Sequence, residues 1–290
     1  MTNPVVVGID GSHGAYAALG WAVQDAVRRG LPLRIVHVRE PWKSEHPVGA
    51  GGGGRSLTER SERLLAGAEE RVRQRAPRLE VTTAHLVGAV VERLRTESET
   101  ADTVVVGSRG LGGFAGLVLG SVGLALAGHA HGPVVVVRAP ELPAAGGGEV
   151  VAGFDGSADA EAALEYAMEQ AAARGARLRV VYARHTVVLA PQAVGYGPLP
   201  AGALADEAAE VGRRLPLWRD KYPEVEVVES AVSGHPVPVL AAASRTAVLL
   251  AIGSRGLGGF AASVLGSTCH GVIHRAHCPV AVVRAPWRRS

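Results

Sequence analysis

Gly107 to Ser121 reads GSRGLGGFAGLVLGS and Gly253 to Ser267 reads GSRGLGGFAASVLGS, with 13 of the 15 positions identical. Each copy follows a short apolar run that predicts a buried strand, and each ends in Gly-Ser before an apolar segment that predicts a helix. Glycine lets backbone N–H groups approach an anion closely, and a helix start points free N–H groups and the positive end of its dipole toward it. The doubled stretch therefore predicts two phosphate-binding sites.

The duplication extends over nearly the whole chain. Residues 5–12 (VVVGIDGS), 33–38 and 133–140 have close counterparts 145 or 146 residues further on. A period this long indicates tandem domains rather than a solenoid. We expect one domain over residues 1–141 and a second over residues 149–290, joined by the Pro-, Ala- and Gly-rich segment between them.

Strands alternate with helical patterns within each repeat. The first repeat predicts five strands, at residues 4–10, 33–38, 80–86, 103–107 and 133–138. It predicts helices at residues 13–29, 56–76, 89–99 and 120–130. Uninterrupted apolar strands are typical of a parallel sheet covered on both faces. We therefore expect an α/β fold of two doubly wound domains, each a five-stranded parallel sheet flanked by helices.

Two segments rich in Gly and Pro fit neither pattern. Residues 41–55 and 186–202 predict long loops after the second strand of each repeat. Such loops could close over a ligand or could be plain surface excursions.

The bulk composition limits the class of protein. The 290 residues are 47% apolar with a net charge of +3, and only three Phe and five Tyr are present, which argues against a nucleic-acid partner. The sequence has no apolar stretch of membrane-spanning length and no secretory leader pattern, so we expect no membrane association. Two cysteines without a disulfide framework suit the reducing cytoplasm.

The acidic residues after the first strands complete a candidate site. Ligands of open parallel sheets bind at the carboxyl ends of strands, where the strand order reverses. Asp10 and Asp155 follow the first strands, and the glycine stretches follow the fourth, so adjacent first and fourth strands would bring them together. A carboxylate repels phosphate, so we expect each Asp to accept hydrogen bonds from a ribose or base at the other end of the ligand. The alternative is that each Asp only fixes the turn into the first helix.

The spacing Gly-x2-Gly-x9-Gly-Ser, beside an Asp-bearing first strand, resembles the nucleotide motif of the universal stress protein family, in its ATP-binding subgroup. The resemblance covers almost all of the chain, as two tandem domains. A Walker pattern with its Lys and a Rossmann Gly-x-Gly-x-x-Gly after the first strand are both missing.

The resemblance implies one adenine nucleotide per domain, with ATP and Mg²⁺ as the expected ligands. For the first site it implies contacts from Gly8, Ile9, Asp10, Val38, Gly107, Ser108, Arg109, Gly110, Leu111, Gly112, Gly113, Gly120 and Ser121. For the second it implies contacts from Gly153, Phe154, Asp155, Ala183, Gly253, Ser254, Arg255, Gly256, Leu257, Gly258, Gly259, Gly266, Ser267 and Thr268. The two arginines either add charge-assisted contacts to phosphate or point to solvent.

Two departures from the family pattern stand out. Many ATP-binding members carry a hydroxyl two residues after the Gly-Ser serine, where this chain has Gly123 and Cys269. This difference leaves open how strongly each site binds the terminal phosphate. Phe154 is larger than Ile9, so the two sites need not bind equally.

The sequence shows no catalytic machinery. Hydrolysis needs a group that orients water, and phosphoryl transfer needs metal ligands and a positioned nucleophile. The resemblance implies binding and signalling, in which the nucleotide orders loops 107–121 and 253–267 and changes the surface offered to a protein partner or a second copy. A slow ATP hydrolase or nucleotidyl transferase, and a nucleotide-free interaction module, remain the alternatives.

A second cluster could bind zinc instead. His270 and His274 lie one helical turn apart, with His277 and Cys278 close behind. Ordinary side chains at a helix end are the preferred interpretation. Cys269 and Cys278 are likewise interpreted as small buried groups rather than a redox pair.

The last strand of each repeat, residues 134–137 and 280–283, is very apolar for a sheet edge. An exposed edge of this kind pairs with another strand. The resemblance implies a homodimer or a pseudo-dimer within the chain. The alternative is that a helix or loop covers each edge.

Overall fold

The computed structural model describes residues 2–41, 57–110, 120–138, 148–184, 217–257 and 265–287. The chain divides into two compact units, Met1–Ala144 (unit 1) and Ala145–Arg289 (unit 2). Of the loops expected at residues 41–55 and 186–202, only Pro41 belongs to the described residues, and the segment joining the domains is described only from Gly148.

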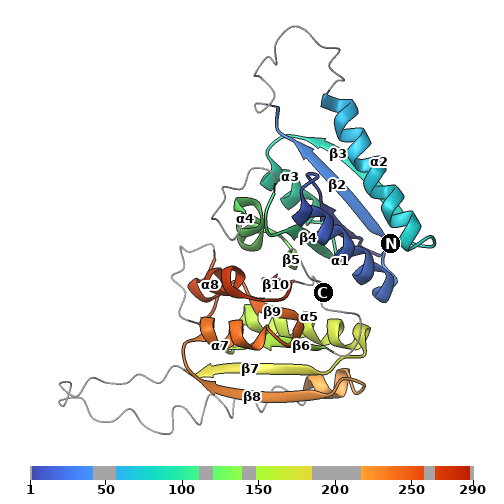
Figure 1. Ribbon diagram of the computed structural model, residues 1–290. Coiled ribbons are helices and arrows are strands. Elements are labelled where there is room, and N and C mark those ends of the chain that lie inside the picture. The colour runs from blue at the N-terminus through green and yellow to red at the C-terminus, as the bar shows by residue number, and fades with distance from the viewer. Residues whose placement is uncertain are drawn as a thin grey trace, which may run out of the picture. The chain divides into compact units, whose positions relative to one another are not determined.

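Unit 1 alternates strands and helices as expected (Figure 1). Its elements are β1 (Val5–Gly8), α1 (His13–Arg29), β2 (Leu33–Arg39), α2 (Leu57–Arg75), β3 (Val81–Val87), α3 (Val90–Glu97), β4 (Thr103–Gly107), α4 (Ser121–His129) and β5 (Val134–Val137). The strands are parallel in the order β3-β2-β1-β4-β5. The prediction of a doubly wound α/β sheet is confirmed.

Unit 2 repeats this topology. Its elements are β6 (Glu149–Gly153), α5 (Ala158–Arg174), β7 (Leu178–Arg184), β8 (Val227–Ser233), α7 (Pro236–Ala243), β9 (Ala247–Gly253), α8 (Ser267–Arg275) and β10 (Val280–Val283). These strands are also parallel, in the order β8-β7-β6-β9-β10. Each strand of unit 2 therefore takes the place of its counterpart in unit 1.

Helices cover both faces of the unit 1 sheet. Successive side chains of a strand point to opposite faces. Val106 lies against the Cβ position of Gly123 in α4, whereas the Cβ position of its neighbour Gly107 lies against Gly14 in α1. Because α3 contacts α4, these two helices share one face, and α1 covers the other.

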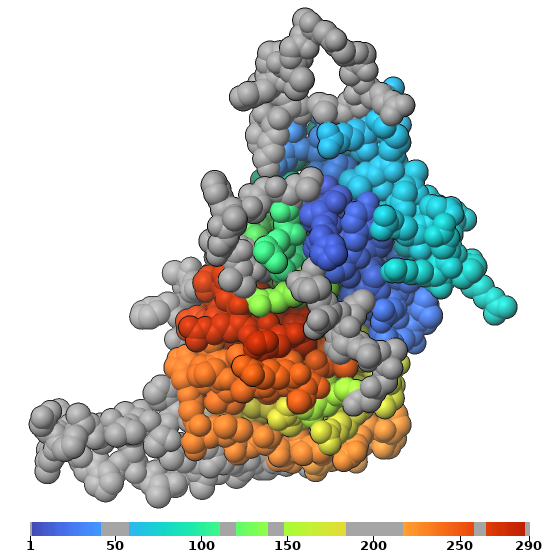
Figure 2. All heavy atoms as spheres, in the orientation of Figure 1, coloured from blue at the N-terminus to red at the C-terminus, as the bar shows by residue number. Residues whose placement is uncertain are grey.

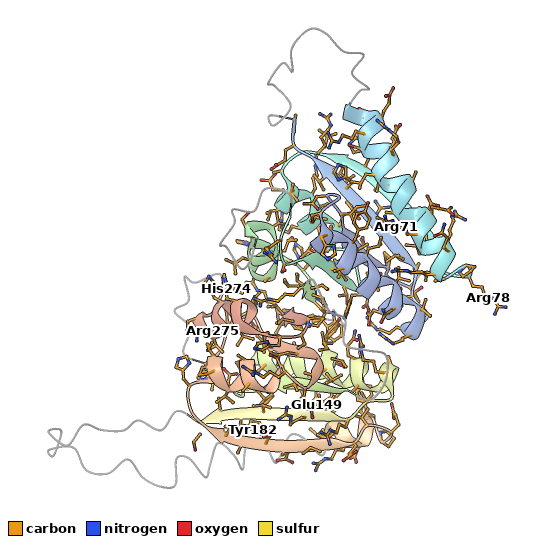
Figure 3. All side chains as sticks on the ribbon, viewed as in Figure 1. Arg71, Arg78, Glu149, Tyr182, His274 and Arg275 are labelled. Atoms are coloured by element: carbon orange, nitrogen blue, oxygen red, sulfur yellow. The ribbon has the colours of Figure 1, made fainter. Side chains whose placement is uncertain are left out.

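α2 lies beside α1, with its outer side at the surface of the unit (light blue in Figure 2). The guanidinium of Arg71, labelled in Figure 3, stacks over the ring of Tyr16 at 4.4 Å from its centroid. This contact joins α2 to α1 beside the buried apolar side chains of α2, Leu65, Ala68 and Val72. Among the described helices, none combines the length and hydropathy that crossing a membrane requires.

The strands and the helix ends follow from local chemistry. Val5, Val6 and Val7 of β1 are fully buried, as a strand covered on both faces must be. α1 begins after Ser12, whose hydroxyl accepts a hydrogen bond from Ala15 N at 3.1 Å, and ends at a left-handed Gly30. α5 uses Ser157 and Gly175 in the same way.

Candidate functional site

The structure brings the predicted acidic residues and glycine stretches together. β1 pairs with β4 in unit 1, and β6 pairs with β9 in unit 2, which is where the strand order reverses. A Cβ on Gly110 would lie 2.5 Å from Asp10 Oδ2, and Gly256 makes the same close approach to Asp155. The sequence predicted that the aspartate and the glycine stretch would meet if the first and fourth strands were adjacent. These strands are adjacent in both units, and the two features do meet.

Asp10 and Asp155 fix local turns. The Ser12 N–H donates to Asp10 Oδ1 at 2.9 Å, and the Ser157 N–H donates to Asp155 Oδ1 at 3.0 Å. Leu257 N also donates to Asp155 Oδ2 at 3.1 Å. The aspartates thus have the turn-forming role that the sequence left open, and Asp155 also accepts a bond from the glycine stretch of unit 2. A carboxylate oxygen can accept further bonds from a ligand beside these.

The two ends of each glycine stretch are tied together. Ser108 N donates to Val137 O at 2.7 Å, and Ser108 O accepts from Gly120 N at 2.6 Å. In unit 2, Gly266 N donates to Ser254 O at 2.8 Å. The candidate residues Leu111, Gly112, Gly113, Gly258 and Gly259 lie outside the described residues.

The helices that follow the glycine stretches begin without a side-chain cap. Gly120 caps α4 and Gly266 caps α8, and neither has a side chain to accept a bond from the first turn. The first N–H groups of a helix have no acceptor within it. The next residues, Ser121 and Ser267, add a hydroxyl at each helix start. This arrangement suits an anion, because the free donors and the helix dipole both favour negative charge.

The two arginines of the glycine stretches have different surroundings. Arg109 is exposed. Arg255 lies with its Nε 3.6 Å from Asp159 Oδ2. The serine caps contact both stretches, since Ser12 Oγ donates to Arg109 O at 3.2 Å and Ser157 Oγ donates to Arg255 O at the same distance.

The residues expected at the nucleoside lie at the ends of the neighbouring strands. Gly8 and Val38 are in β1 and β2, and Gly153 and Ala183 are their counterparts in β6 and β7. Ile9 and Phe154 follow at matching positions, each 5% exposed. The backbone of this end is bonded to the sheet, since Ile9 N donates to Val36 O at 2.9 Å.

The side chains next to this end, from His37 and Tyr182, are not among the site residues predicted from the sequence. His37 of β2 lies 2.8 Å through Nδ1 from Ile9 O and stacks on His85, with 6.0 Å between the ring centroids. Burial, with smaller contributions from nearby positive charge, lowers the pKa of His85. At the position of His37, unit 2 has Tyr182 (Figure 3), whose ring meets Phe154 edge-on at 5.9 Å. The matched stretches LRIVHV and LRVVYA held the signal, a His and a Tyr one residue before Val38 and Ala183.

The alternative zinc site is not assembled. The rings of His270 and His274 lie 4.7 Å apart. However, no three His, Cys, Asp or Glu side chains gather as a metal site in the part of the chain that the structure describes, which includes His277 and Cys278.

Both cysteines should be unreactive in the folded protein. Cys269 and Cys278 are free and buried, and burial, together with the nearby charge of Asp159, raises the pKa of the Cys269 thiol. Because the thiolate is the nucleophile, a colorimetric thiol reagent should label neither residue in native protein and both in denaturant. Rapid labelling of one thiol per native chain would contradict the buried, inert assignment.

Comparison with known proteins identifies the family. The sequence model of the Universal stress protein family matches residues 1–138 and 148–284. The chain is 35% identical to universal stress protein Rv1996 of Mycobacterium tuberculosis, over 97% of this chain and 95% of that protein. It is 30% identical to universal stress protein Rv2623 of the same organism, over 97% and 96%.

The fold agrees with this identification. The crystal structure of a universal stress protein from Archaeoglobus fulgidus superposes with a TM-score of 0.72 at 22% identity, covering 98% of this chain and 99% of the other. Family matches in both halves and full-length relatives support the same conclusion. The chain belongs to the universal stress protein family and carries two domains of that family in tandem.

Proposed function

We propose that each unit binds one adenine nucleotide, with ATP as the ligand, at the carboxyl edge of its sheet. The observation that carries this proposal is the pair of uncapped helix starts at Gly120 and Gly266, each tied to a glycine stretch at the point where the strand order reverses. Two helices of the same chain, α1 and α5, begin on serine caps. The described helix α3 (N-cap Ala89) also lacks a side-chain cap, so what distinguishes α4 and α8 as phosphate sites is the glycine stretch tied to each uncapped start.

The two ends of the site indicate the orientation in which the nucleotide would bind. The helix start and the glycine stretch favour the phosphates. The ends of β1 and β2 offer buried apolar side chains and backbone groups, which suit a base and ribose. Asp10 lies between these ends, against Gly110, where its carboxylate could accept a bond from a ribose hydroxyl.

Mg²⁺ would bind together with the nucleotide rather than at a site of its own. The described residues offer no cluster of carboxylates or imidazoles for a metal. Magnesium commonly keeps several waters and binds substrate phosphates. The described residues therefore fit a metal held chiefly by the phosphates, with Ser121 and Ser267 as nearby oxygen donors.

Nucleotide released from the protein tests the proposal directly. Freshly purified protein, unfolded and separated by chromatography, should release an adenine nucleotide, and protein stripped of ligand should show a higher melting temperature when ATP is added. Release of no nucleotide, together with no thermal shift at millimolar ATP, would favour the nucleotide-free interaction module.

The consequence of binding is part of the same proposal. A nucleotide at Gly120 or Gly266 would contact residues 107–121 or 253–267 and change the surface offered to a partner or to a second copy. We place this activity in the cytoplasm, in line with two free thiols. Sedimentation with and without ATP should show a change in association, and identical profiles would reject this coupling.

A further inference from the structure

The two units differ at the second residue of the helix that follows their first strand. α1 and α5 are both 17 residues long and begin after a serine cap. Gly14 of unit 1 and Asp159 of unit 2 therefore occupy the same position. Gly14 brings no side chain to this place, whereas Asp159 brings a carboxylate that is only 7% exposed.

The Asp159 carboxylate is bound into the start of the unit 2 glycine stretch. Its Oδ2 accepts hydrogen bonds from Ser254 Oγ at 2.7 Å and from Arg255 N at 3.1 Å. Its Oδ1 accepts from Ala285 N at 3.0 Å, and the Arg255 guanidinium lies 3.6 Å from Oδ2 through Nε. A hydroxyl, backbone N–H groups and a guanidinium are the donors that bind phosphate oxygens in proteins. In unit 2 these donors are already bonded to an anion of the protein itself.

In the described part of unit 1, Gly14 stands at the position of Asp159, where it brings no anion and leaves no room for one. A Cβ on Gly14 would lie 2.5 Å from the backbone oxygen of Arg109. Arg109 is exposed and makes no ion pair within the described ranges. The start of the unit 1 stretch thus carries the charges of Arg109 and Asp10, which cancel. Unit 2 has the equivalent pair and Asp159 as well, so it is more negative by one charge.

We propose that Asp159 is a specificity-determining residue that weakens ATP binding in unit 2, so that ATP fills unit 1 first and unit 2 favours a less charged adenine ligand, a nucleoside or nucleoside monophosphate. This inference rests on the proposed nucleotide sites and deepens them. A triphosphate in unit 2 meets a buried carboxylate whose charge is poorly screened, and Arg255 is already paired. A neutral nucleoside meets no such repulsion.

Two single-site proteins compare the units. Gly120→Asp puts a negative charge at the start of α4 and leaves only unit 2 open to phosphate, while Gly266→Asp leaves only unit 1 open. Calorimetric titration should give a dissociation constant for ATP at least about tenfold lower in Gly266→Asp than in Gly120→Asp. The adenosine constants of the two proteins should agree within about threefold, because neither aspartate opposes a neutral ligand.

Variants of Asp159 then test the cause. In the Gly120→Asp background, Asp159→Asn removes the charge, and Asp159→Gly restores the residue of unit 1. Both should raise ATP affinity about tenfold and leave adenosine affinity unchanged, so that adenosine binding also reports that unit 2 is folded. Asp220→Asn, at an exposed position of unit 2, removes the same charge from a residue that takes no part in the bonds described above and should change neither affinity.

Two outcomes would overturn the inference. Equal or tighter ATP binding by unit 2 in the single-site comparison would do so without any Asp159 variant. Unchanged ATP affinity in both Asp159 variants, with adenosine still bound, would do so as well. If neither single-site protein nor the unaltered chain binds ATP, the nucleotide sites themselves are rejected, and this inference falls with them.

Discussion

Replacing Gly120 and Gly266 together by Asp should lower ATP affinity at least about a hundredfold while leaving the fold intact. An N-cap carboxylate accepts the N–H bonds of the first helical turn and repels phosphate from the same place. Both glycines have extended backbone that any residue adopts, with φ of −77° and −68°. A Cβ there would meet its nearest atoms, Ser108 O and Ser254 O, at 3.5 and 3.3 Å, so the side chains fit with little adjustment.

The matched control is Gly120→Asn with Gly266→Asn. Asn caps a helix about as well as Asp but carries no charge, so ATP affinity should fall clearly less than with Asp. The free energy of unfolding of both double variants should stay within about 1 kcal/mol of the unaltered protein, since Gly and Asp or Asn differ little as caps. Unaltered ATP affinity in the folded Asp variant would reject the assignment of the phosphates to α4 and α8.

The fold could be predicted where local chemistry and periodicity agree. The helix predicted at residues 13–29 matches α1, because a serine cap at one end and a glycine at the other both leave a local signature. The strand predicted at residues 103–107 matches β4, since a strand buried on both faces gives a continuous apolar run. The strand order was not predicted: the sequence left the adjacency of the first and fourth strands conditional, and the structure shows β1 beside β4 and β6 beside β9.

The site could be predicted only in part, because several of its contacts join residues far apart in sequence. The sequence placed Asp155 near the second glycine stretch, but not the bond from Leu257 N that it accepts. Asp159 looks like an ordinary acidic residue in the first turn of a helix, where the dipole favours it. Only the tertiary structure shows that its hydroxyl partner, Ser254, lies 95 positions further along the chain.

Gly107→Ala should destabilise unit 1 by about 1–3 kcal/mol or more, the usual cost of overpacking a core. Its Cβ would lie 2.5 Å from the backbone carbon of Gly14 and 2.6 Å from the oxygen of the same residue. Backbone atoms cannot rotate away as a side-chain end can, so α1 must move from β4. Gly253→Ala should cost less, because its nearest atom, Ala160 N, would be 2.9 Å away.

Gly67→Ala should change the stability of unit 1 in the opposite direction. Gly67 lies inside α2, and a Cβ there would meet nothing within 4 Å. Alanine should therefore stabilise the helix by about 0.5–1 kcal/mol, because it loses less conformational entropy on folding. Urea unfolding of the three variants should rank the free energy of unfolding as Gly67→Ala, then Gly253→Ala, then Gly107→Ala. If Gly107→Ala were as stable as Gly67→Ala, the close approach of α1 to β4 could not hold, and the glycine stretch that begins at Gly107 would have to start from a different position.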